Sequence, residues 1–244
     1  MLTPIKFFSS DDINQLNEDI WRTIYTKGND FHFGGAEEVK DAREVFAVIQ
    51  IYGKALQDLY EGKLPKGWKF GEAANKVYIE MLKNPDKGDQ PYTYGERLHS
   101  YYVSVSDSFS RHHVCVNQVE NLKEALKESI ETGIQSNRIV FVIWNPLDIK
   151  MENPDCFNWG QLRVSEGNKV SIRIVFRSND AGNAVFANVG AVIRVFVDEA
   201  INPAGGELEE VIWTAASEHI YLTDFDMVEN LVGKVPEHLR RLMK

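Results

Sequence analysis

The stretch from Cys156 to Asn188 contains the side chains best suited to chemistry. A thiol at Cys156 opens it, and Arg177, Ser178 and Asp180 follow close together at the end of a predicted strand. Asn188 comes next, after a run of small residues. A thiol, a guanidinium, a hydroxyl, a carboxylate and a carboxamide therefore lie at the ends of predicted elements, where active sites are usually built.

Cys156 is a candidate nucleophile. It follows the turn Asn153-Pro154-Asp155 and lies outside any apolar periodic run, where a buried structural cysteine would normally be found. Reactivity requires a lowered thiol pKa, and Arg177 is the residue that could lower it if the two meet in the fold. An inert thiol remains the alternative from position alone.

Arg177, Ser178 and Asp180 each have a functional and a structural interpretation. A guanidinium beside a hydroxyl at a strand end can bind a phosphate, whereas a surface ion pair is the alternative for Arg177. Asp180 could hold a ligand or cap the helix that follows.

Three further residues could line the same pocket. Asn188 lies among apolar residues and must find hydrogen-bond partners if it is buried. His219 and Tyr221 alternate along an extended segment, so they face either one pocket or the core. The adjacent pair His112-His113 lacks the spacing of a closed zinc site, and no metal is expected.

The elements that must position these residues indicate a single α+β domain over residues 1–244. The segment 31–43 is predicted to be a loop, in which Gly34-Gly35 forms a turn or cradles a phosphate. The helix 72–83 is predicted to turn Val77 and Met81 inward, which on its own would leave Glu80 as a surface charge. Residues 139–144 form a continuous apolar run typical of a central strand. Predicted helices cover residues 13–27, 72–83, 117–132, 184–200 and 224–232, and predicted strands 45–51, 139–144, 161–164, 170–176 and 208–216. A hairpin turn is expected at 165–168, a turn-rich segment at 87–98, and either a short strand or an irregular segment at 101–110.

Composition narrows the class of protein. The net charge of -9 argues against a nucleic-acid surface, but a few convergent arginines can still bind a small anion. Cys115 and Cys156 are too few for a disulfide framework, so a reduced, cytoplasmic protein is expected. Neither a membrane span nor a signal peptide is expected from the hydrophobic pattern.

The sequence contains a set of motifs, which are YTYGERL, NRI with VIWNP, FRSND and EHIY. Through these motifs the sequence resembles thymidylate synthase, because they recur in the order of its shorter archaeal and phage-like branch. The resemblance runs from about Tyr92 to Tyr221. It implies a mixed β-sheet flanked by helices, with two chains dimerising through the sheet. It also implies a methyltransferase that converts dUMP to dTMP, with 5,10-methylenetetrahydrofolate as both carbon donor and reductant and without a metal.

The resemblance assigns roles to the central stretch. Cys156 matches the nucleophile that adds to C6 of the pyrimidine. Arg177 and Ser178 match phosphate ligands, and the arginine also favours the thiolate. Asp180 matches the carboxylate that holds the folate pterin. Asn188 matches the amide that reads O4 and N3 of uracil; cytosine-using hydroxymethylases of the family carry aspartate there.

Flanking residues receive roles in the same way. His219 and Tyr221 match ligands of the sugar 3'-hydroxyl, and Tyr94 matches the tyrosine implicated in removing the C5 proton through water. Glu80 matches the glutamate that relays protons at O4. Arg138 matches one of two adjacent arginines that reach the phosphate from the other subunit, which implies an obligate homodimer.

Three departures from the family pattern leave other functions open. Asn137 replaces the first paired arginine, Phe157 replaces the histidine that commonly follows the nucleophile, and VPEHLRRLMK replaces an apolar closing tail. A looser lid would admit water, so the alternative is a hydroxymethylase acting on dUMP, dCMP or CMP. A third possibility is a catalytically silent nucleotide-binding dimer, although a binder needs neither Cys156 nor Asp180.

Overall fold

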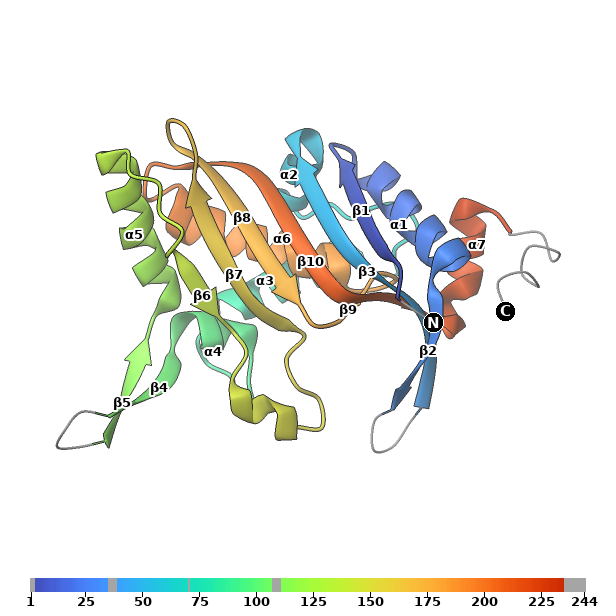
Figure 1. Cartoon of the computed structure of the whole chain (residues 1–244), viewed down its shortest axis with the longest axis horizontal. Helices are drawn as coiled ribbons and strands as arrows, with labels where there is room; N and C mark the ends of the chain where they lie inside the picture. The colour runs from blue at the N-terminus through green and yellow to red at the C-terminus, as the bar shows by residue number, and fades with distance from the viewer. Residues whose placement is uncertain (1–2, 35–38, 70, 107–110, 235–244) are drawn as a thin grey trace.

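A mixed β-sheet forms the centre of the protein (Figure 1), which a computed structural model describes over residues 3–34, 39–69, 71–106 and 111–234. The strands of the sheet are β1 (Ile5–Ser10), β2 (Asn29–Gly34), β3 (Val39–Tyr52), β6 (Val140–Val142), β7 (Phe157–Val164), β8 (Lys169–Phe176), β9 (Asn179–Asp180) and β10 (Glu207–Tyr221). Their order is β1-β3-β10-β8-β7-β6, with β2 paired to β3 and β9 paired to β10. Parallel pairs join β1 to β3 and β10 to both β8 and β9, and the other pairs are antiparallel.

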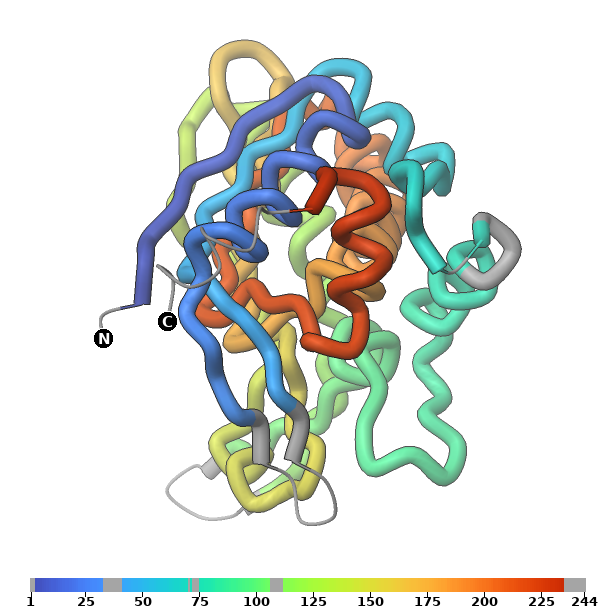
Figure 2. Tube along the Cα trace, turned by 90° about the vertical axis from the view of Figure 1, so that its right-hand side faces the viewer, coloured from blue at the N-terminus to red at the C-terminus, as the bar shows by residue number. Residues whose placement is uncertain are grey.

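Helices cover one face of this sheet, and no described element lies over the other, as Figure 2 shows from the side. The helices are α1 (Ile13–Lys27), α2 (Gly53–Tyr60), α3 (Glu72–Lys83), α4 (Tyr94–His99), α5 (Gln118–Thr132), α6 (Val185–Phe196) and α7 (Phe225–Val232), with short helical segments η1 (Pro146–Lys150), η2 (Val197–Ile201) and η3 (Leu222–Asp224). A separate hairpin consists of β4 (Tyr101–Ser106) and β5 (Arg111–Val116). None of the described helices is long and apolar enough to cross a lipid bilayer.

The two faces of the sheet differ because successive side chains of a strand point to opposite sides. On β3, Ala47, Ile49 and Ile51 are buried beneath the helices, whereas Phe46 and Val48 between them are partly exposed on the uncovered face. The same alternation continues along β10, and the buried hydrophobic residues form one cluster. The described part of the chain therefore leaves a sheet face uncovered on which apolar residues such as Phe46 and Val48 alternate with polar ones such as Gln50 and Arg173.

The strand pairing brings chemistry-bearing residues to one end of the sheet. Phe157 at the start of β7 pairs with Phe176 at the end of β8, so Cys156 lies beside the residues that follow β8. Because β10 runs parallel to β8, its C-terminal half reaches the same end, where His219 pairs with Asp180 of β9. The fold thus joins segments far apart in the chain.

The α+β class, with a large mixed sheet flanked by helices, is confirmed. The predicted helices over 13–27, 72–83 and 117–132 correspond to α1, α3 and α5, and α6 with η2 covers the predicted helix over 184–200. The hairpin predicted across residues 165–168 joins β7 to β8.

The prediction of a central strand over residues 139–144 is wrong. This run forms β6, a strand of three residues at the end of the sheet order, in which Val140 and Val142 are exposed and only Phe141 is buried. The apolar run reflects the uncovered face of the sheet, which a sequence pattern cannot distinguish from burial on both faces.

The inward face predicted for helix 72–83 is also wrong. Val77 and Met81 are exposed, whereas Asn75, Ile79 and Leu82 are buried. The Asn75 amide donates to the carbonyl oxygen of Gly62 at 3.1 Å, which fixes this rotation of the helix about its axis.

Two segments predicted as irregular contain regular structure. In the loop expected over 31–43, β2 extends to Gly34 and β3 begins at Val39, and the expected turn partner Gly35 lies outside the described residues. The turn-rich segment YTYGERL includes α4, whose N-terminus is capped by the Thr93 hydroxyl accepting from the backbone N–H of Glu96. A Cβ at Gly95 would overlap the carbonyl oxygens of Met81 and Asn84, so only glycine lets α4 pack against the end of α3.

Candidate active site

The Arg177 side chain secures the turn that carries the cysteine. Its Nε donates to the carbonyl oxygen of Asp155 and its Nη2 to that of Pro154, both at 2.7 Å. The backbone N–H of Arg177 donates to the carbonyl oxygen of Cys156 at 2.8 Å. These bonds hold the half-buried Cys156 against the end of β8 and leave part of the guanidinium edge available for an anion.

The environment of Cys156 combines opposing influences on its pKa. Burial raises the pKa of this thiol, the Arg177 guanidinium lowers it, and the Asp155 carboxylate raises it further. The net direction is upward, because loss of water around the sulfur outweighs the guanidinium. Arg177 thus acts in the direction expected from the sequence, but by itself does not make Cys156 a thiolate.

Four tyrosines surround the cysteine closely enough for a charge on the sulfur to raise their pKa values: Tyr78, Tyr92, Tyr94 and Tyr221. Burial is the larger cause of each increase, so the phenols stay protonated and can donate hydrogen bonds. The Tyr94 hydroxyl also accepts from the backbone N–H of Phe157 at 3.4 Å, which places it next to the nucleophile.

Asn188 is held by residues from two other elements. Its Oδ1 accepts from the Tyr78 hydroxyl at 2.7 Å, and its Nδ2 donates to Oδ1 of Asn179 at 3.2 Å. Tyr78 is on α3, Asn179 is on β9 and Asn188 lies in the first turn of α6. The amide is therefore partly satisfied by the protein, as a half-buried polar group requires.

Ser178, His219 and Tyr221 form a second group at the end of β10. Ser178 Oγ lies 3.4 Å from Nδ1 of His219, and the rings of His219 and Tyr221 meet edge to face with centroids 5.0 Å apart. Burial lowers the pKa of His219, so the neutral imidazole is favoured and can serve as donor or acceptor to a hydroxyl group.

Asp180 supports the chain before α6. Its Oδ1 accepts from the backbone N–H groups of Gly182 and Asn183 at 2.8 and 3.1 Å, so it stabilises a turn and not the first turn of the helix. Burial raises the pKa of Asp180, and the nearby His219 lowers it. The carboxyl remains a suitable acceptor for a ligand that brings N–H groups of its own.

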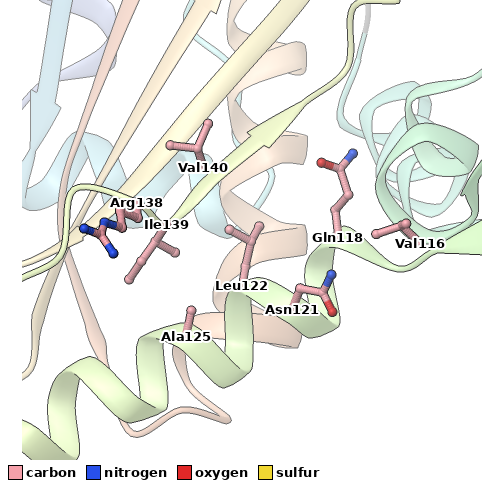
Figure 3. Close-up of a pocket in the computed structure, with 8 residues that line it drawn as sticks. All are labelled: Val116, Gln118, Asn121, Leu122, Ala125, Arg138, Ile139 and Val140. Atoms are coloured by element: carbon pink, nitrogen blue, oxygen red, sulfur yellow. The ribbon is translucent and has the colours of Figure 1, made fainter. Parts of the chain in front are cut away.

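Glu80 and Arg138 do not join this cluster within one chain. Glu80 is exposed on α3, one residue beyond the buried Ile79. Arg138 is exposed next to β6, where with Ile139 and Val140 it lines a pocket against α5 (Figure 3). The other candidate residues of the sequence meet at the end of β8 and β10.

Four residues near the cysteine were not singled out as candidates from the sequence: Tyr78, Tyr92, Asp155 and Asn179. Tyr92 and Asn179 belong to recognised motifs, and Asp155 precedes the cysteine directly, so each could have been suspected from position. Tyr78 was hidden by the wrong helix phase, because a helix turned towards Val77 and Met81 would carry it elsewhere.

Asp155 is fully buried beside the nucleophile. No well-formed hydrogen bond reaches its side-chain oxygens from the described residues, but the Tyr92 hydroxyl lies close enough to lower its pKa. Arg97 lies near but is engaged by Asp148 at 3.0 Å and stands over the Tyr92 ring at 5.7 Å. Burial raises the pKa of Asp155 to about 7, Arg97 lowers it, and Asp148 raises it. Among the residues that the structure places, no cluster of His, Cys, Asp and Glu side chains could hold a metal ion.

Comparison with known proteins gives a consistent result. The family model described as Thymidylate synthase matches residues 9–243. A protein of Methanopyrus kandleri named "Putative thymidylate synthase" is 28% identical, over 85% of this chain and 90% of its own length. One of the same name from Methanosarcina acetivorans is 28% identical over 72% of this chain and 75% of its own. A protein named "Thymidylate synthase" from Listeria monocytogenes serotype 4b (strain CLIP80459) is 30% identical over 94% of this chain and 66% of its own.

The raised pKa of Asp155 predicts a pH-dependent cost to stability. The folded chain holds this proton up to a pKa of about 7, whereas an ordinary aspartate releases it near 3.8. Between these values the folded state binds more protons than the unfolded state, so stability falls as pH rises, and the full cost is present above pH 7. We expect Asp155→Asn to raise the free energy of unfolding at pH 8.5 by roughly 1–3 kcal/mol, with little change at pH 4.

Chemical denaturation at the two pH values measures this difference. Asp86→Asn on the exposed segment after α3 provides the matched control and should give the same small effect at both. An equal effect of Asp155→Asn at both pH values would contradict the prediction.

Proposed function

Because this chain belongs to the thymidylate synthase family, whose name denotes a methyltransferase-type enzyme, we propose that it converts dUMP to dTMP by reductive methylation. The observation that supports this most is the position of Tyr78, which donates to Asn188 and lies close enough to Cys156 for the charge on the sulfur to raise its pKa. A possible nucleophile and a possible reader of the pyrimidine edge therefore share one neighbour.

In this proposal the nucleotide phosphate binds the free edge of the Arg177 guanidinium and the Ser178 hydroxyl. The sugar 3'-hydroxyl meets His219 and Tyr221 at the end of β10, where their rings are in contact. The base then lies over Cys156 with its O4 and N3 edge against Asn188. Ser178 lies 3.4 Å from His219, so the proposed phosphate and sugar ligands are neighbours at the strand ends.

Cys156 has the central chemical role. C5 of uracil is a poor nucleophile, and addition of a thiolate at C6 turns C5 into an enolate-like carbon. Burial raises the pKa of Cys156 and favours its thiol form in the free protein, so in this proposal the sulfur loses its proton as it adds to C6 of the bound base. Tyr94, a protonated phenol bonded to the backbone of Phe157, is placed to guide removal of the C5 proton through water.

The co-substrate 5,10-methylenetetrahydrofolate supplies the one-carbon unit and the hydride when it binds. The described residues fit its pterin, since Asp180 presents a carboxyl whose raised pKa would be lowered by N–H donors from a ligand. Glu80 keeps its proposed proton-relay role only through a rearrangement of α3, because it is exposed in this structure.

We propose a homodimer formed through the uncovered face of the sheet. Ile5 and Phe7 of β1 and Trp159 of β7 are among the exposed large hydrophobic residues, and Phe46 and Val48 lie partly exposed between them on β3. A large apolar surface on one chain is typical of an interaction site. The partner would then supply its Arg138 to the phosphate. The free cysteines Cys115 and Cys156 fit a reducing compartment, so the cytoplasm is the expected location.

An assay of the purified chain with dUMP and 5,10-methylenetetrahydrofolate tests the activity. We expect dihydrofolate absorbance to appear together with dTMP identified by mass. Cys156→Ser should lower turnover by on the order of a thousandfold or more while leaving dUMP binding nearly unchanged, because only the covalent step needs the sulfur. The matched control is Cys115→Ser at the exposed second cysteine, which should keep full activity.

Other products would identify other functions. A hydroxymethyl nucleotide without folate oxidation would identify the hydroxymethylase, in which water replaces hydride. Nucleotide binding without any product would identify a silent dimer. Full turnover by Cys156→Ser would contradict the role of Cys156.

Mixing two inactive variants tests whether Arg138 acts across the dimer. A subunit with Arg138→Ala retains Cys156, and a subunit with Cys156→Ser retains Arg138, so a mixed dimer has one complete site. Random exchange should restore about a quarter of wild-type activity. Activity that stays at the level of the separate variants would show that Arg138 does not serve the other subunit's site. The control for loss of a surface charge mixes Cys156→Ser with Lys127→Ala, on the exposed face of α5, in place of Arg138→Ala.

A further inference from the structure

We propose that Tyr78, together with Asn179, fixes the Asn188 amide in the orientation that reads uracil and so sets the preference for uracil over cytosine. Tyr78 is a positioning residue in this account, since it acts through Asn188. The inference rests on the proposed function and identifies which residue of α3 serves the base.

Three separate elements meet at the amide. The Tyr78 hydroxyl from α3 lies 2.7 Å from Asn188 Oδ1, and Asn179 Oδ1 from β9 lies 3.2 Å from Asn188 Nδ2. Asn179 is 2% exposed and is held by the pairing of β9 with β10. Asn188 is anchored by the helical bond from its N–H to the carbonyl oxygen of Ala184 at 2.8 Å.

The remaining bonding capacity of the amide matches one base. A carboxamide has two N–H donors and an oxygen with two lone pairs. Asn179 uses one N–H and Tyr78 uses one lone pair, which leaves one donor and one acceptor for a ligand. Uracil presents an acceptor at O4 and a donor at N3, whereas cytosine presents a donor at N4 and an acceptor at N3. The free pair on Asn188 therefore complements uracil.

Turning the amide over to suit cytosine would break both contacts. Its oxygen would face Oδ1 of Asn179, acceptor against acceptor. Its NH2 group would donate to the Tyr78 oxygen, and the Tyr78 proton would lose its present acceptor, Asn188 Oδ1. Burial raises the pKa of Tyr78, so the hydroxyl keeps its proton and remains a donor. The Tyr78 hydroxyl thus opposes the flip, because its proton would lose the acceptor that Asn188 Oδ1 now provides.

The rotation of α3 explains why a tyrosine holds this position. Asn75, Ile79 and Leu82 are buried and set the helix phase, and Tyr78 then faces α6 while Glu80 faces outward. A neutral phenol, and not the Glu80 carboxylate, consequently lies beside the amide that reads the base. A donor of fixed polarity there suits discrimination better than a group that changes charge.

The test is the ratio of dissociation constants for dCMP and dUMP, measured by calorimetry on the full chain. Tyr78→Phe removes only the hydroxyl, and we expect this ratio to fall about fivefold to tenfold, since one neutral hydrogen bond no longer opposes the flip. The exposed Tyr102→Phe is the matched control and should leave the ratio unchanged. In an Asn188→Ala background, Tyr78→Phe should have no effect on the ratio, because no amide remains to be oriented.

The outcomes separate this inference from the proposed function. A wild-type chain that binds neither nucleotide overturns both. Two outcomes overturn the role of Tyr78 alone. In one, Tyr78→Phe keeps the wild-type preference for dUMP; in the other, it weakens binding of dUMP and dCMP by the same factor. A change in the ratio that persists in the Asn188→Ala background also overturns it, because Tyr78 would then act by another route. Thermal unfolding of each variant confirms that it is folded.

Discussion

The site depends on one interaction, the clamp between the Arg177 side chain and the turn that precedes Cys156. Charged N–H groups bonded to carbonyl oxygens are among the stronger hydrogen bonds in proteins, and here two of them reach Asp155 and Pro154. The clamp joins the start of β7 to the end of β8, and it keeps a positive charge beside the sulfur. Because β10 runs parallel to β8, the same strand end also receives His219 and Tyr221.

The electrostatics around Cys156 favour the neutral thiol in the free chain. Burial and Asp155 oppose ionisation of the thiol, and Arg177 favours it. The surrounding tyrosines stay protonated and supply donors without adding charge. A chain with a net charge of -9 can therefore bind an anionic nucleotide through a few placed groups.

Much of this arrangement could be predicted from the sequence, because the chemistry lies in short motifs. FRSND gives Arg177, Ser178 and Asp180 by position, and the pairing of β7 with β8 brings Cys156 beside them. The failures have a common physical cause. The burial of a helix face or of a strand depends on what packs against it, and the sequence of one element does not contain that information. The predicted phase of α3 is therefore wrong and turns Tyr78 away from the site, and the run predicted as a central strand is the edge strand β6.

The most direct test of the account is mass analysis of the chain after incubation with 5-fluoro-dUMP and 5,10-methylenetetrahydrofolate. The fluorine at C5 cannot leave as a proton does, so the thioether formed by Cys156 should persist once the folate carbon is attached. The account predicts a folate-dependent increase in mass confined to the peptide that contains Cys156, with the exposed Cys115 unmodified. No adduct, or an adduct on Cys115, would contradict it.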